Sequence, residues 1–396
     1  MSESSAPGLS RAAVALVLIS LAVGGFAIGV GEFASMSVLP DFAHAFGIDE
    51  PHAAHAISAY ALGVVVGAPL LAVLGSRTPR WLLLAALMGM FAVGNMLSAA
   101  SPTFAWMVIF RFLAGLPHGA YFGVAALVAA SVVSPAVRTR AVASILAGLT
   151  VATVIGVPVA TVIGHEFGWR WTFVCVAVLA LLTATLVLLF APREAAAAGA
   201  SPLRELGALK NAQVWLTLGI GAIGFGGMFA VYAYLASTLT FVTGVGITVM
   251  PYVFAAFGVG MFAGNMIGAW AADHFGMKAG AVLLIWSAAM LALYPAAAHS
   301  LPTIILIVAL IGGGGGLASV LQTRLMDVAG EAQTLAAALN HSAFNVANAL
   351  GPFLGGLTIA AGFGWTSTAW VGVGLALVGL AIWAVAMRVP TATPTH

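Results

Sequence analysis

Charged residues are so sparse in this chain that long apolar runs separate them. No Asp, Glu, Lys or Arg occurs between positions 12 and 31 or between 211 and 272 of the 396 residues. Only 6% of the residues are charged, whereas a soluble domain carries about 25%. A water-soluble protein of this length would need a polar surface that this chain cannot supply. We therefore predict an integral membrane protein.

The apolar runs predict twelve transmembrane helices. Hydrocarbon about 30 Å thick needs roughly 20 apolar residues per helix, and charges or Gly/Pro breaks divide the chain into spans of that length. Six expected spans lie on each side of a long polar stretch. The predicted organisation is a six-helix bundle at 1–192, a cytoplasmic linker at 193–212 and a second six-helix bundle at 213–396.

The basic residues predict the orientation in the membrane. With the N-terminus inside, Arg111 falls within a span and Arg170 outside, which leaves 11 of the 13 Lys and Arg residues on the cytoplasmic side. This distribution follows the positive-inside rule. Both termini are therefore predicted to be cytoplasmic, and the acidic, His-bearing loop 41–50 to lie outside. The expected location is the inner cell membrane.

Sequence features recur at about half the chain length. The matches are Gly115 and Gly119 with Gly312 and Gly316 at an offset of 197, loop 72–80 with 269–278 at the same offset, and 151–156 with 346–351 at an offset of 195. A proline follows both members of the last match, at Pro158 and Pro352. Two parallel six-helix repeats around a midplane site are typical of a rocking transporter.

Several motifs resemble those of a known family. They are Gly31-Glu32-Phe33 with Leu39-Pro40-Asp41 at the end of span one, Arg111 to Gly119 (RFLAGLPHG) in span four, and Gly148 to Gly164 in span five. The chain resembles the major facilitator superfamily, and its first half resembles the drug:proton antiporter branch with its drug- and sugar-efflux members. The resemblance implies two pseudo-symmetric six-helix bundles and proton-coupled efflux of a small organic molecule, such as a drug or sugar, by rocker-switch alternating access.

Two charged side chains are expected inside the membrane. If span one continues to Leu39, Glu32 lies ~10 Å deep at ~1.5 Å per residue, where a carboxyl that gains and loses a proton could couple transport. Alternatively the helix ends sooner and Glu32 is solvated. Arg111 remains charged, and we expect it to pair with Glu32 in one conformation; its alternative is a structural brace. Asp41 is assigned to proton coupling with them.

Polar and aromatic side chains within the spans are candidates for substrate binding. They are His118 in span four, Tyr232 and Tyr234 in span seven, and His341, Asn345 and Asn348 in span eleven. The three span-eleven residues share one helical face, and neutral amides suit a polyhydroxy or amide-bearing substrate. Aromatic side chains beside glycines suit a flat or amphipathic ligand. For every candidate, helix packing or interhelical hydrogen bonding is the alternative.

Other residues are assigned to gating, and several functions are excluded. The gating candidates are Arg77, Arg80, Asp273 and Lys278 in the inner loops, with Gly156 and Pro158 in span five. No phosphate-binding loop, metal-ligand spacing or nucleophile elbow occurs, so no enzymatic activity, cofactor or metal is expected. With a net charge of +2 and no basic block, nucleic acid is not an expected partner. The expected partners of a monomer are substrate, protons and the lipid bilayer. Proton-coupled uptake is the main alternative, and a non-transporting sensor is less favoured.

Overall fold

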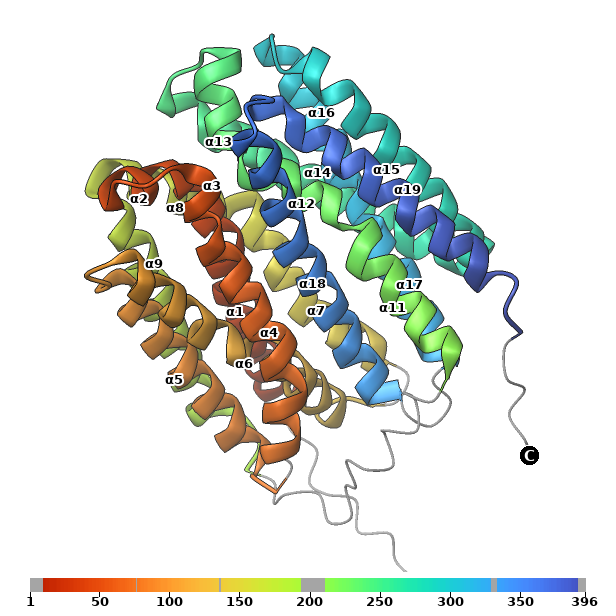
Figure 1. The fold of residues 1–396 in the computed structure, drawn as a ribbon. Helices are drawn as coiled ribbons and strands as arrows, with labels where there is room; N and C mark the ends of the chain where they lie inside the picture. Colours follow the sequence, from red (N-terminus) through yellow and green to blue (C-terminus); the bar gives the residue numbers. More distant parts are fainter. Residues whose placement is uncertain (1–9, 76, 135–136, 194–210, 329–332, 391–396) are drawn as a thin grey trace, which may run out of the picture.

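The computed structural model describes residues 10–75, 77–134, 137–193, 211–328 and 333–390, and all regular structure in these ranges is helical. Most of the predicted linker, 193–212, lies outside them. Twelve helical segments are long and apolar enough to cross a membrane, which confirms the predicted all-α membrane fold. Figure 1 shows two bundles side by side, the first half in red to yellow-green and the second in green to blue.

Short irregular turns interrupt some of the spans. The first half contains α1 (Arg11–Ser37), α2 (Leu39–Phe46), α3 (Glu50–Ala53), α4 (His55–Leu74), α5 (Arg80–Ala99), α6 (Phe104–Ser131), α7 (Arg138–Val151), a π-helical turn (Ala152–Gly156), α8 (Val157–Phe167) and α9 (Trp169–Phe190). The second half contains α11 (Ala212–Gly224), α12 (Gly226–Ala233), α13 (Leu235–Thr238), a π-helical turn (Leu239–Thr243), a 3-10 turn (Ile247–Val249), α14 (Met250–Phe275), α15 (Met277–Ala297), α16 (Leu301–Gly313), a 3-10 turn (Gly314–Gly316), α17 (Leu317–Val328), α18 (Gln333–Ala360), a 3-10 turn (Trp365–Ser367) and α19 (Thr368–Ala386).

The first span ends earlier than the sequence suggested. α1 ends at Ser37, and Val38 leaves the helical conformation with φ −103° and ψ 16° before α2 begins. Pro40 lies in the first turn of α2, where its missing N–H does no harm, so it starts the next helix and does not terminate α1. Glu32 consequently lies five residues before the end of α1, or ~8 Å along its axis at ~1.5 Å per residue.

Close helix contacts in both halves confirm the predicted offset of 197. A Cβ added at Gly63 in α4 would collide with the carbonyl oxygen of Phe112 in α6. A Cβ added at Gly260 in α14 would collide with the carbonyl oxygen of Ala309 in α16. Both members of the second pair lie 197 positions after those of the first. The two halves therefore bring spans two and four, and spans eight and ten, together through equivalent glycines.

The predicted match at offset 195 is wrong. Gly148 of α7 packs on the backbone of Ala22, and Gly351 of α18 packs on the backbone of Gly226, so the equivalent positions are 203 to 204 residues apart. Gly156, matched with Gly351 from the sequence, instead contacts side chains of α1. Between the first and second spans of each half the offset falls from 204 to 197, because the connection after α1 carries two extra helices, α2 and α3, whereas its counterpart before α14 has only a 3-10 turn. It rises again to 203 at α7 and α18, so the second half has six more residues between its fourth and fifth spans.

The halves touch through α4 and α18 and through α8, its preceding π-helical turn and α14. Ser58 of α4 donates a hydrogen bond of 2.9 Å to the carbonyl of Ala349 in α18. Gly258 of α14 lies against the backbone of Thr153. We call the end of the molecule that carries α2 and α3 the α3 end, and the opposite end, where α9 stops and α11 begins, the linker end (Figure 1).

Candidate functional site

Glu32 of α1 bonds directly to the second half of the protein. Its side chain is only 6% exposed, and the amide of the fully buried Asn348 on α18 donates a hydrogen bond of 2.8 Å to Glu32 Oε1. The two residues are 316 positions apart in the chain. Any movement that separates α1 from α18 must break this bond.

Arg111 of α6 is buried within the first half. Its Nη2 donates hydrogen bonds to the Gly31 carbonyl at 3.3 Å and to Ser35 Oγ at 3.2 Å. The guanidinium carbon lies 4.1 Å from the ring centre of Tyr60 and 5.3 Å from that of Phe173, so two aromatic faces stabilise the cation. In the described ranges no carboxylate lies within 4.0 Å of the guanidinium, and Nε and Nη1 have no hydrogen-bond partner. The expected pairing with Glu32 is absent from this conformation and remains a prediction for another.

The fold itself does not require an arginine at position 111 or a tyrosine at position 60. Tyr60 and Phe257 are equivalent at offset 197, since their carbonyls face the equivalent residues Gly115 and Gly312. At the same offset Arg111 corresponds to Val308. The second half thus packs the same helix pair with apolar side chains in both places. A buried cation that the scaffold can omit is better explained by function than by packing.

A line of rings leads from Arg111 towards the second half. The hydroxyl of Tyr60 is hydrogen-bonded to His118 Nδ1 at 3.0 Å. The His118 ring lies 5.5 Å from that of Phe122, which stacks on His341 of α18 at 5.2 Å with an interplanar angle of 7°. The structure thus places two predicted residues, His118 and His341, on either side of one phenylalanine at the contact between the halves.

The amides of α18 point in two directions, as expected from their helical spacing. Asn348 and His341 face the first half, whereas Asn340 donates a hydrogen bond of 2.8 Å to Gln322 within the second half. Asn345 is buried and donates to the carbonyl of His341 at 3.0 Å. The Oδ1 atoms of Asn345 and Asn348 accept no hydrogen bond within the described part of the chain. Two buried acceptors therefore remain available to a ligand.

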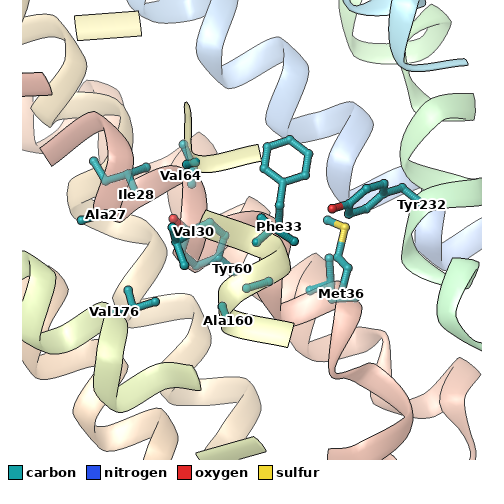
Figure 2. Packing of buried hydrophobic residues seen from close by; sticks show 14 of the residues in the cluster. Ala27, Ile28, Val30, Phe33, Met36, Tyr60, Val64, Ala160, Val176 and Tyr232 are labelled. Carbon is teal, nitrogen blue, oxygen red and sulfur yellow. The ribbon is translucent and has the colours of Figure 1, made fainter. Parts of the chain in front are cut away.

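The two predicted tyrosines have different surroundings. Tyr232 packs edge-on to Phe33 of α1 at 5.5 Å and lies 4.3 Å from the Phe257 ring, and its buried hydroxyl has no partner among the described residues. Figure 2 shows Phe33 and Tyr232 facing each other between the halves. The Tyr234 hydroxyl instead donates to the Pro352 carbonyl at 2.9 Å. Tyr232 therefore keeps a free polar atom at the contact between the halves, whereas the Tyr234 hydroxyl is already engaged.

The remaining predicted residues lie away from this centre. Asp41 of α2 pairs with His165 at 3.1 Å near the α3 end. The predicted gating charges Arg77, Asp273 and Lys278 are exposed and Arg80 is half-buried, and none forms an ion pair within the described ranges. Gly156 and Pro158 flank the junction between the π-helical turn and α8. The structure does not bring these residues together with Glu32.

Sequence reasoning missed five residues that contact the predicted ones or join the halves. They are Ser35, Tyr60 and Phe173 around Arg111, and Glu50 and Ser237 at the α3 end. Tyr60 carried one usable signal, because it replaces a phenylalanine at offset 197. Glu50 lies directly before a proline, which is typical of a helix start. The spacing of the other three residues carried no such signal.

Comparison with known proteins identifies the family. The family model of the Major Facilitator Superfamily matches residues 21–251 and 220–396. The chain is 38% identical over 368 residues to the inner membrane transport protein YdhP of Escherichia coli K12, covering 91% of this chain and 94% of the relative. It is 33% identical to the putative transporter AraJ of the same organism, covering 89% and 90%. It is 35% identical to a chloramphenicol resistance protein of Streptomyces lividans, covering 93% and 95%.

A solved structure has the same fold. A bacterial homologue of the human lysosomal transporter Spinster, crystallised in an inward-facing and occupied conformation, superposes with a TM-score of 0.75 at 18% identity, covering 98% of this chain and all of the other. With twelve helices able to span a membrane and transporters among its relatives, the protein is a multi-pass membrane transporter and not an enzyme. As its motifs suggested, the chain belongs to the major facilitator superfamily.

Proposed function

We propose that this transporter exports a small organic molecule in exchange for protons by rocking its two halves around a central site. It would act as a monomer in the inner membrane, with the α3 end outside, as the basic residues predict. Glu32 would carry the proton. Arg111 would pair with Glu32 in another conformation, and Asp41 would contribute to coupling from the α3 end.

The hydrogen bond between Glu32 and Asn348 is the observation that carries the proposal. An ionised carboxylate accepts a charge-assisted bond from the amide, which is about twice as strong as a bond to the neutral acid. Protonation of Glu32 therefore changes how strongly the halves hold together. A group whose protonation biases one of two conformations links proton binding to transport.

The neighbouring side chains favour a substrate with both polar and aromatic parts. The free Oδ1 atoms of Asn345 and Asn348 can accept hydrogen bonds from hydroxyl or amide groups. Phe33 and Tyr232 offer ring faces and one free hydroxyl. Chloramphenicol combines an aromatic ring with hydroxyl and amide groups, and a relative is named for resistance to it. It is therefore the first substrate to test, with sugars second.

The test is transport by the purified protein in liposomes under an imposed pH gradient. Wild type should accumulate labelled chloramphenicol or sugar against its concentration gradient. Glu32→Gln should still exchange substrate across the membrane without accumulating it, because glutamine keeps the hydrogen bond but cannot ionise. Glu166→Gln, which changes an exposed carboxyl, is the matched control and should behave as wild type. Accumulation by Glu32→Gln at the wild-type level would refute the proposal.

Uptake by proton symport is the second candidate, because the same rocking movement can run in either direction. The pH gradient is therefore imposed in both orientations. Substrate movement against the proton flux supports export by antiport, whereas movement with the proton flux establishes symport.

A further inference from the structure

Glu50 is a second carboxyl between the halves. It is the first residue of α3, and its side chain is only 9% exposed, although the neighbouring Asp49 is exposed. Acidic side chains are almost never buried unless they are paired. Within the described ranges no Lys, Arg or His nitrogen lies within 4.0 Å of the Glu50 carboxyl. The group is therefore buried without a compensating cation.

The hydrogen-bond partner of Glu50 belongs to the second half. The hydroxyl of Ser237 in α13 donates to Glu50 Oε2. The next residue, Pro51, lies beside Gly356 of α18: a Cβ added to this glycine would come 3.3 Å from the Pro51 Cβ. Glu50 thus lies where the two halves close against each other at the α3 end. If these halves separate, Glu50 loses its donor and becomes accessible to water.

Within the described ranges, none of the titratable side chains around Glu50 forms an ion pair with its carboxyl. They are Asp41 and His44 on α2, Asp49 directly before α3, His52 on α3, His55 on α4 and Tyr234 before α13, and the described part of α18 that faces α3 carries none. Asp41 is itself paired with His165. An ionised Glu50 would thus face nearby acidic groups with a single neutral donor, which makes its charged form costly while it is buried.

We propose that Glu50 is a second proton-binding residue of the transport cycle, protonated while the α3 end is closed and ionised when that end is open. On opening, the carboxylic acid O–H transfers its proton to water and leaves a hydrated carboxylate. On closing, a proton from the same side returns to the carboxylate before it is buried. The assignment of this step to transport rests on the proposed proton-coupled function.

The experiment measures opening of the α3 end directly, without substrate. Spin labels are attached at Ala45→Cys and Phe363→Cys, two exposed positions in opposite halves, with Cys175→Ser removing the native thiol. Pulsed electron paramagnetic resonance on the full-length protein in lipid nanodiscs then gives the open-to-closed ratio between pH 5 and 9. Closing binds a proton at Glu50, so this group makes a rising pH favour the open form.

Each proton bound by only one of two states changes their ratio by up to about tenfold per pH unit. Glu50→Gln is permanently neutral, so the slope of log(open/closed) against pH should fall by up to one. Asp49→Asn removes an exposed carboxyl but keeps the N-cap oxygen that accepts the hydrogen bond from the His52 N–H. Its slope should therefore match wild type. Because ionised Glu32 holds the halves together more strongly, its own contribution to the slope is negative, and Glu32→Gln should show the positive slope that belongs to Glu50.

The inference is overturned if Glu32→Gln, in which Glu50 alone should contribute, shows no rise of the open form with pH. It is also overturned if Glu50→Gln keeps the wild-type slope, or if Asp49→Asn loses as much. If Glu50→Gln does not fold, Ser237→Ala replaces it: removing the donor should shift the midpoint of the profile, and an unchanged midpoint overturns the inference. If the pH slope of the open-to-closed ratio depends on Glu50 but the liposomes show no proton-driven transport, the inference about Glu50 stands and only the proposed function is refuted.

Discussion

Replacing Asn348 with alanine removes the hydrogen-bond donor that Glu32 has on α18. The bond is 2.8 Å long and both side chains are buried. Leaving a buried acceptor without its donor costs about 1–3 kcal/mol, which corresponds to a change of about 5- to 150-fold in a two-state equilibrium. Since the bond exists only while α1 and α18 touch, Asn348→Ala should favour the open α3 end by that factor.

The assay is the distance distribution between labels at Ala45 and Phe363, measured at one pH. The matched control is Asn340→Ala, which removes the same side chain from the same helix but breaks a bond to Gln322 inside the second half. Its open fraction should equal that of wild type. In a Glu32→Ala background, Asn348→Ala should have little further effect, because interacting residues are not additive. An unchanged open fraction in Asn348→Ala, or an equal change in Asn340→Ala, would refute the reasoning.

Three further predictions concern the first half. Arg111→Lys should fold but lose most counterflow of chloramphenicol across the liposome membrane, because an ammonium lacks the planar guanidinium and stacks less well on the rings of Tyr60 and Phe173. Counterflow at the wild-type rate would show that Arg111 only supports the structure. Tyr60→Phe keeps the ring beneath Arg111 and loses only the hydrogen bond to His118. It should retain more counterflow activity than Tyr60→Leu, which also loses a cation–π contact of about 0.5–2 kcal/mol; equal losses of activity in the two variants would contradict this role of the ring. Gly63→Ala should lower the melting temperature by several degrees, because the added Cβ collides with the carbonyl oxygen of Phe112. Gly89→Ala adds a Cβ with nothing within 4 Å and should melt as wild type; equal melting temperatures of the two variants would count against the close contact of α4 with α6.

The spans could be predicted from the sequence because lipid imposes a simple requirement. Every backbone group in hydrocarbon must be satisfied within a helix, and the charges that interrupt the apolar runs therefore fall at helix ends. The glycines at offset 197 could also be interpreted, because close helix contacts need them. The match ending at Gly156 failed because insertions between spans change the offset, and a single sequence does not reveal where they lie.

The side-chain partners were decided only by the tertiary structure. Helical spacing placed His341 and Asn348 on one face of α18, but it could not say that this face meets Glu32 and Phe122. Spacing along a helix determines direction, whereas the partner depends on how helices far apart in the chain cross. Glu50 shows the same limit: the sequence placed it only in an outer loop, and the packing of α3 against the second half is what buries its carboxyl.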